Sequence, residues 1–209
     1  MEKFLYPIIA LTGSVHIAAF YLKKPIWRLF LKPATTILVI VLALMQPVYI
    51  PETYRILILA GLVFSLIGDV MLVLPKEQFI PGLVSFFIAH ILFIVAFSLD
   101  FGFQWEWIFF IIVLVVMSPY LWILFRNTKE MTFPVVAYAL VLLVLLWQTL
   151  ARFWFYADSR STYIFLGTLL FVFSDSVLAY NKFVKKILPA ELLFMVTYWS
   201  ALILFALSI

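Results

Sequence analysis

Two aspartates stand inside stretches of the chain that are otherwise apolar. Asp69 lies within Ser65–Lys76 and Asp175 within Val172–Lys182. Aligned on these residues, both stretches show a small residue, Asp, two residues, Leu, three residues and Lys. An ionisable group at the middle of a bilayer costs about 2.5 to 3.5 kcal/mol on insertion scales. We therefore expect the two aspartates to be functional.

The two carboxylates are also expected to lie at one depth. Asp69 precedes Pro75 by six residues and Asp175 precedes Asn181 by six, which places each about 9 Å from the end of its helix. Two carboxylates close together in a medium of low dielectric cannot both ionise easily, so one stays a protonated acid and the other a base. Such a pair suits hydrolysis through an oxocarbenium-like intermediate, in which one group donates a proton and the other activates water.

Further polar residues fall in or near the same layer. His90 and Tyr198 each follow a proline by nine residues, which places both about 13 Å into their helices. His16 falls there too, while the mouth of the layer would hold Lys32, Asn181, Lys182 and Glu191. A purely structural interpretation stays open, in which the aspartates are hydrogen-bonded helix contacts and His90 is a satisfied core histidine.

The composition is that of a membrane protein. Hydrophobic residues make up 67% of the 209 residues and charged residues only 11%. The absence of cysteine excludes disulfides, thiolate metal sites and cysteine nucleophiles, and we expect no metal and no cofactor. The net charge of +4 lies in short loops between apolar runs, so it indicates control of topology and no nucleic-acid partner.

Eight apolar runs are long enough to cross about 30 Å of hydrocarbon as helices. We therefore predict an all-α fold, a polytopic membrane bundle of about eight transmembrane helices in a single transmembrane domain over residues 1–209. The predicted helices are Phe4–Leu22, Ala34–Ile50, Ile56–Leu74, Leu83–Leu99, Trp107–Phe125, Val135–Leu150, Thr162–Tyr180 and Ala190–Leu207.

The loops predict orientation and a repeat. The basic residues of the cytoplasmic side would include Lys32, Lys76, Lys129 and Lys182, and both termini would lie on the opposite side. Prolines stand at corresponding places, with Pro33 and Pro134 opening the second and sixth helices and Pro81 and Pro189 the fourth and eighth. This register is consistent with a four-plus-four parallel internal repeat.

Together these residues resemble the YhhN-type lysoplasmalogenase family of multi-pass membrane proteins. The resemblance covers nearly the whole chain from Lys32 onward. It is carried by Lys32-Pro33, Gly68-Asp69-Val70-Met71-Leu72, Phe86-Phe87-Ile88-Ala89-His90, Pro134 with Tyr138, Thr197-Tyr198 and, as its most specific part, the block Ser174–Phe183.

The resemblance implies an ether-bond hydrolase. Members of that family cleave the vinyl ether bond of lysoplasmalogens to a fatty aldehyde and glycerophosphocholine or glycerophosphoethanolamine, within a membrane and without a cofactor. Asp69 and Asp175 would then be the catalytic pair. The substrate-binding residues would be His90, Tyr198, Asn181, Lys182 and Lys32, the two lysines being candidates for the phosphate. The compact chain is typical of a bacterial member in the inner membrane, with a lysophospholipid substrate and membrane lipids as its partners.

Two positions depart from the family pattern. Phe93 stands where a tyrosine often follows the histidine, and Leu202 stands where a glutamine is common in the last helix. Each removes a polar group, which puts the substrate and the last helix's role in doubt more than the aspartate pair.

Three other functions are compatible with two intramembrane aspartates. The first is a proton-coupled transporter that uses the pair as a relay. The second is an intramembrane aspartyl protease, although Leu66 interrupts the Gly-x-Gly-Asp pattern of those enzymes. The third is a structural lipid-binding bundle. Aldehyde release that depends on both aspartates would separate the hydrolase from all three.

Overall fold

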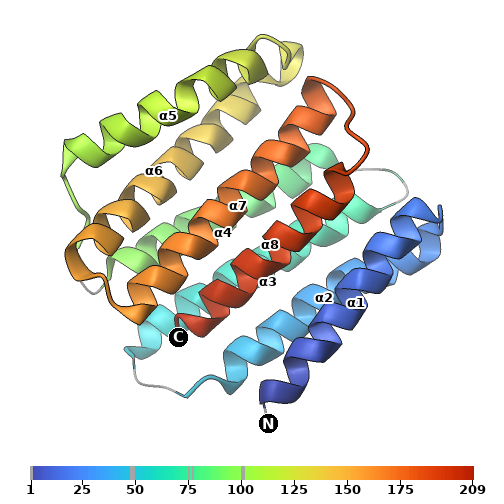
Figure 1. Cartoon of the computed structure of the whole chain (residues 1–209), viewed down its shortest axis with the longest axis horizontal. Coiled ribbons are helices and arrows are strands. Elements are labelled where there is room, and N and C mark those ends of the chain that lie inside the picture. Colours follow the sequence, from blue (N-terminus) through green and yellow to red (C-terminus); the bar gives the residue numbers. More distant parts are fainter. Residues whose placement is uncertain (1, 48–49, 75, 77, 100–101) are drawn as a thin grey trace.

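The computed structural model describes residues 2–47, 50–74, 76, 78–99 and 102–209, and these form a bundle of α-helices (Figure 1). Short 3₁₀ turns, η1 (Glu2–Phe4) and η2 (Lys129–Met131), precede two of the helices. The helices within the described residues are α1 (Leu5–Tyr21), α2 (Pro25–Met45), α3 (Glu52–Val73), α4 (Phe79–Ser98), α5 (Trp107–Phe125), α6 (Thr132–Tyr156), α7 (Ser159–Phe183) and α8 (Ala190–Leu207).

All eight predicted helices are confirmed, and one boundary is wrong in a way that affects the site. α2 begins at Pro25, nine residues before the predicted Ala34, and Pro33 lies inside the helix instead of opening it. Pro25 occupies a first-turn position, where a missing N–H is harmless. Pro33 removes one internal hydrogen bond, and the helix continues because its neighbours pack around it. Lys32 therefore lies about 10 Å inside the helix and is buried.

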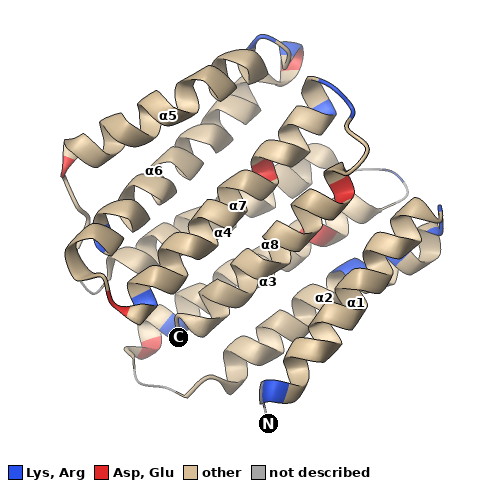
Figure 2. Ribbon diagram, in the orientation of Figure 1, with Lys and Arg blue, Asp and Glu red and all other residues tan. Residues whose placement is uncertain are grey.

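The chain is a multi-pass membrane protein. Seven of its helices, α2 to α8, are long and apolar enough to span a membrane, and α1 is a shorter apolar helix. Large apolar side chains are exposed along the outside of the bundle, as expected for a surface that contacts lipid. Figure 2 shows Lys and Arg gathered mainly at the two ends of the bundle.

The packing of the first four helices recurs in the last four. α3 packs most extensively on α4 as α7 does on α8, and α2 packs on α3 as α6 does on α7. The halves meet through two corresponding contacts, α4 with α6 and α8 with α2. This arrangement supports the predicted repeat and places α3 and α7, which carry the two aspartates, at equivalent positions.

Helix α5 stands apart from the main core. The largest cluster of buried apolar side chains draws on every helix except α5. α5 packs chiefly on α6, with a smaller contact to α7, and forms its own two small clusters. It lies at the edge of the bundle beside α6 (Figure 1). A pocket between α5 and the rest of the bundle can therefore exist without opening the main core.

Candidate active site

Asp69 is fully buried on α3 and has three donors around its carboxylate. Lys32 Nζ lies 3.2 Å from Oδ1. Thr36 donates its hydroxyl to Oδ2 at 2.6 Å and Tyr198 donates to the same oxygen at 2.8 Å. Trp199 Nε1 in turn donates to the Thr36 hydroxyl at 3.3 Å. Helices α2 and α8, from opposite halves of the repeat, thus hold one carboxylate of α3.

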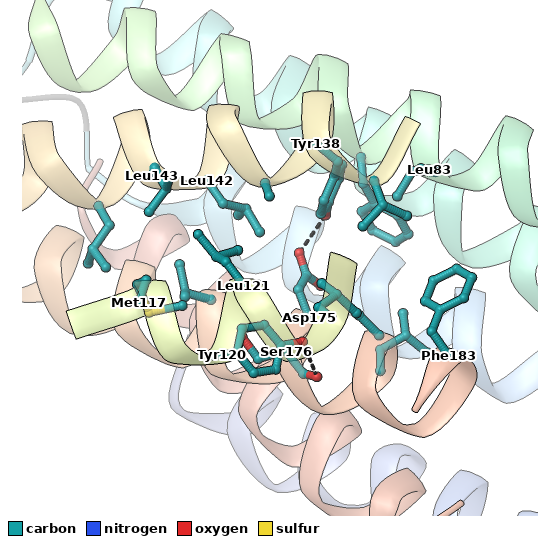
Figure 3. A pocket seen from close by; sticks show the side chains of 18 of the residues that line it. Leu83, Met117, Tyr120, Leu121, Tyr138, Leu142, Leu143, Asp175, Ser176 and Phe183 are labelled. Carbon is teal, nitrogen blue, oxygen red and sulfur yellow. Dashed lines mark hydrogen bonds between the residues drawn. The ribbon is translucent and has the colours of Figure 1, made fainter. Parts of the chain in front are cut away.

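Asp175 has a different environment on α7. The hydroxyl of Tyr138 on α6 donates to its Oδ2 at 2.5 Å, and the two side chains point toward each other across the pocket (Figure 3). Tyr120 on α5 donates to the neighbouring carbonyl of Ser176 at 2.8 Å. Within the described residues, no cation lies within ion-pair distance of Asp175. Aliphatic side chains such as Leu121 complete the surroundings.

Lys32 links the two carboxylates electrostatically. Its ammonium group pairs with Asp69 and also interacts at longer range with Asp175. The same ammonium lies 5.6 Å from the centre of the Phe194 ring. The carbonyl of Phe194 accepts a hydrogen bond from Ser174, the residue before Asp175. Lys32 is therefore a charged group with which both aspartates interact, while the closeness of the two carboxylates to each other stays a prediction.

A chain of aromatic rings connects the hydroxyl on Asp69 with the hydroxyl on Asp175. The ring of Tyr198 contacts Phe171 edge-on, with centroids 5.5 Å apart. Phe171 contacts His90 at 4.6 Å and His90 contacts Tyr138 at 5.3 Å, both edge-on. Neither ring nitrogen of the buried His90 has a hydrogen-bond partner among the described residues. His90 thus supports the tyrosine on Asp175, and it lines neither of the two cavities described next.

An apolar pocket of about 70 Å³ lies between α5 and the helices α4, α6 and α7. Its wall carries one carboxylate, Asp175, and the hydroxyls of Tyr120, Tyr138 and Ser176. Figure 3 shows leucines around this carboxylate, with Met117 on the α5 side. The pocket is a small apolar space with an acidic group in its wall, as a site for the end of an apolar chain would be.

A larger polar cavity of about 1150 Å³ opens where α1, α2, α7 and α8 meet. Among the described residues of its lining, Glu191 is the one acidic side chain, and it contacts His16 at 3.3 Å and Arg28 at 3.5 Å. The described basic residues of the lining are Lys23, Arg28, Lys32, Lys182 and Lys186. Because basic side chains predominate in this described lining, the cavity suits an anionic group.

Aromatic rings hold three of these cations in place. Arg28 lies over Phe20 at 4.5 Å and Lys182 over Phe79 at 4.2 Å, in addition to Lys32 near Phe194. Such contacts orient a cation without neutralising it. Arg28 and Lys32 also pair with carboxylates, Glu191 and Asp69 respectively.

The two cavities adjoin. Leu72, Phe79 and Leu178 line both. We expected the aspartates to face one cavity, and the structure differs, because Asp175 lines the apolar pocket while Asp69 lines neither. Asp69 lies behind Lys32, which forms part of the wall of the polar cavity.

The remaining predicted residues divide between the cavity and the scaffold. Lys182 lines the polar cavity. Asn181 also lines it, but its Oδ1 accepts the backbone N–H of Ile187 at 2.9 Å, so it holds the α7–α8 connection. Lys32 was placed at the mouth and is instead inside α2 against Asp69. That position follows from the early start of α2.

Sequence reasoning named Tyr198 but missed the roles of the two other hydroxyl groups that hold the carboxylates, those of Thr36 and Tyr138. Thr36 lies four residues after Lys32, one helical turn away, and this spacing could have identified it. Tyr138 stood in the resemblance without a role. Among the described residues, no group of three or more His, Cys, Asp or Glu gathers to hold a metal ion.

Comparison with known sequences now identifies the family. The sequence model of the YhhN family matches residues 27–209. The chain belongs to the YhhN family. It is 34% identical over 156 residues to "Lysoplasmalogenase TMEM86B" of Homo sapiens, covering 74% of this chain and 64% of that protein. The corresponding protein of Rattus norvegicus is 32% identical over 208 residues, covering 100% of this chain and 84% of that protein.

A bacterial YhhN relative is similar as well. "Uncharacterized membrane protein YhhN" of Escherichia coli O157:H7 is 27% identical over 170 residues, covering 81% of this chain and 80% of that protein. The chain spans less than two thirds of the human relative's length. No solved structure matches the chain.

Proposed function

We propose that this YhhN protein is a lysoplasmalogenase, a hydrolase of the vinyl ether bond of lysoplasmalogens. The observation that carries the proposal is a carboxylate, Asp175, in the wall of an apolar pocket that adjoins a basic cavity. A lysophospholipid has the matching parts, an apolar chain and an anionic head group with the reactive bond between them. The relatives named lysoplasmalogenase support the same substrate class.

The substrate would lie across the junction of the two cavities. Its phosphate would bind in the polar cavity to Lys182, with Arg28 and Lys186 close by. Its alkenyl chain would enter the apolar pocket between α5 and α6, where the ether end meets Asp175. The products would be a fatty aldehyde and glycerophosphocholine or glycerophosphoethanolamine.

The chemistry would use the two aspartates as an acid and a base. Protonation of the β-carbon of a vinyl ether gives an oxocarbenium ion, which water then attacks. One carboxyl group can supply the proton and the other can receive a proton from the water. Both α3 and α7 run unbroken past their aspartates, which favours this role over a transporter with interrupted helices.

A parallel assay tests the proposal. Purified protein is given lysoplasmalogen and, separately, the ester-linked lysophospholipid with the same head group, and fatty aldehyde and free fatty acid are measured. We expect aldehyde from the first lipid and no fatty acid from the second. Asp175→Asn and Asp69→Asn should each abolish aldehyde release while the variants still insert and fold. Hydrolysis of the ester lipid, or full activity in either variant, would contradict the proposal.

A further inference from the structure

The two aspartates have unlike surroundings. Asp69 accepts two hydroxyl hydrogen bonds and faces the ammonium of Lys32 at 3.2 Å, all out of contact with solvent. A buried ammonium that faced a neutral acid would be an uncompensated charge, which is strongly unfavourable. The two hydroxyl donors and the cation therefore fit a carboxylate and not a carboxylic acid at this position.

Asp175 has the opposite surroundings. It receives one hydroxyl hydrogen bond, from Tyr138, and the described residues offer it no ion pair. The pocket around it is lined almost entirely by hydrocarbon. A charge in such a setting, with no partner at ion-pair distance, is less favourable than the neutral acid. The group that faces the apolar chain is thus the one suited to carry a proton.

We propose that Asp175 is the proton donor and that Asp69 is the ionised member of the pair, with Lys32 as its counter-ion and not as a ligand of the phosphate. This inference rests on the proposed function. It changes the role of Lys32 from substrate binding to positioning, because Lys32 acts on the reaction through Asp69.

The steps balance without a co-reactant other than water. Asp175 transfers its proton to the β-carbon, the carbon–carbon double bond is consumed, and the α-carbon becomes an oxocarbenium ion. Water forms a bond to that carbon and its proton passes to Asp69. Asp69 is then a neutral acid beside the Lys32 ammonium, a state of high energy that exists only transiently. The resulting hemiacetal returns its hydroxyl proton to Asp175 while Asp69 gives its proton up to the departing glycerol oxygen and becomes a carboxylate again. The carbon–oxygen bond breaks, and both carboxyl groups regain their starting states.

Infrared spectroscopy tests the two protonation states without any need for activity. The probe is the C=O stretching band of a protonated carboxylic acid in the purified protein at neutral pH, identified by its shift in D₂O. We expect the wild-type band to vanish in Asp175→Asn and to persist in Asp69→Asn. Loss of the band in Asp69→Asn, or its persistence in Asp175→Asn, would overturn the assignment even if lysoplasmalogen is hydrolysed.

Kinetics with a substrate that lacks phosphate test the role of Lys32. Lys32→Met should lower kcat about 100-fold both for lysoplasmalogen and for 1-alkenylglycerol, with little change in KM. Lys32→Arg should restore much of kcat, because it returns the cation. Lys182→Met should instead raise KM for lysoplasmalogen. The KM values for lysoplasmalogen and for 1-alkenylglycerol should therefore differ less in this variant than in the wild type.

Two outcomes distinguish this inference from the proposed function. A loss in Lys32→Met that appears as raised KM, and only with the phosphate-bearing substrate, would make Lys32 a phosphate ligand and refute the inference alone. Failure of the wild type to release aldehyde from either lipid would refute the proposed function. The double variant Lys32→Met/Asp69→Asn leaves no unpaired charge at this site. Comparing its thermal unfolding with that of Lys32→Met shows whether the single variant loses activity because it unfolds.

Discussion

Thr35 and Thr36 are neighbours on α2, and only one of them contacts Asp69. Thr36 donates to the carboxylate at 2.6 Å, whereas Thr35 donates to the carbonyl of Leu31 at 2.8 Å and to Thr12 at 3.1 Å. A hydrogen bond to a charged group contributes about 1.5 to 3 kcal/mol. We therefore expect Thr36→Val to lower kcat for aldehyde release by about tenfold or more, measured by steady-state kinetics.

The adjacent threonine is the matched control. Thr35→Val makes the same isosteric change one residue away and should leave kcat close to that of the wild type. Thr36→Ser keeps the hydroxyl and should retain most of the activity. Equal losses in the two valine variants would show that the effect comes from helix packing and not from the bond to Asp69.

At the residue scale the sequence identified the two carboxylates and some of their partners, but not the pairing. Asp69, Asp175 and Tyr198 were identifiable because a polar group in an apolar run is conspicuous and its depth follows from helix geometry. Depth does not say which face of a helix a side chain occupies relative to its neighbours. Consequently the sequence could place the aspartates in one layer, but it could not show that Lys32 forms its ion pair with Asp69.

At the scale of elements, glycines set how closely paired helices approach. A Cβ on Gly167 of α7 would lie 2.7 Å from the ring of the buried Phe205 on α8. A Cβ on Gly82 of α4 would lie 3.1 Å from the Leu72 side chain and 3.5 Å from the Gly68 carbonyl oxygen, both longer contacts. Both changes to alanine gain the same helix propensity, so the contact decides the difference. We expect Gly167→Ala to be less stable than Gly82→Ala by about 1 to 3 kcal/mol.

Thermal unfolding in one detergent measures this pair of variants directly. Gly167→Ala should unfold at a lower temperature than the wild type, and Gly82→Ala at nearly the wild-type temperature. A Gly82→Ala variant that is as unstable as Gly167→Ala would mean that the α7–α8 contact is no tighter than the α3–α4 contact near Gly82.

The N-terminus of α7 offers a prediction outside the membrane. Asp158 is the N-cap and accepts the backbone N–H of Ser161 at 2.6 Å. Partial burial raises the pKa of Asp158, but the hydrogen bonds from Ser161 and the nearby Arg152 and Arg160 outweigh it and hold this pKa below its usual value. Loss of an N-cap costs about 1 kcal/mol, so Asp158→Ala should be less stable than the wild type at neutral pH.

The pH dependence of this cap has a definite sign. The pKa of Asp158 is lowered in the folded state. The stabilisation by the ionised cap is therefore present above the ordinary aspartate pKa and is lost as the pH falls through the lowered value. The difference in unfolding temperature between the wild type and Asp158→Ala should therefore shrink on acidification. Asp158→Asn, which can cap without charge, should show a smaller dependence on pH, and a difference that grows at low pH would contradict the assignment.

The error at the start of α2 shows what sequence patterns cannot fix at the element scale. Pro33 follows a basic stretch and precedes an apolar run, so it was assigned to the start of the helix. A proline inside a helix loses one hydrogen bond, and packing against α1 and α3 compensates for it. Runs of apolar residues thus located all eight helices, but they could not show that α2 extends far enough to bury Lys32.

At the scale of the molecule, the predicted repeat would explain why each aspartate accepts a hydroxyl hydrogen bond from the helix that precedes its own. Thr36 on α2 contacts Asp69 on α3 as Tyr138 on α6 contacts Asp175 on α7. Tyr198 on α8 then contacts Asp69 from the other half of the repeat. An ancestral pair of equivalent sites would account for this arrangement, and the unequal surroundings of the two carboxylates are departures from that symmetry.

The distribution of charge over the whole bundle predicts its orientation. The α1–α2, α3–α4, α5–α6 and α7–α8 connections share one end of the bundle, and this end carries most of the Lys and Arg residues, while both termini lie at the other end (Figures 1 and 2). From the positive-inside rule we propose that the lysine-rich end faces the cytoplasm of a bacterial inner membrane. The polar cavity would then receive its lipid from the cytoplasmic leaflet.

Because the chain has no cysteine, single-cysteine labelling can test this orientation without background. Lys186→Cys places a thiol at the lysine-rich end and Ser159→Cys places one at the opposite end, both at exposed positions. A membrane-impermeant thiol reagent should label Ser159→Cys in intact cells and Lys186→Cys only after the membrane is opened. The reverse pattern would place the polar cavity on the outer leaflet, and lysophospholipid would then have to reach the aspartates from outside the cell.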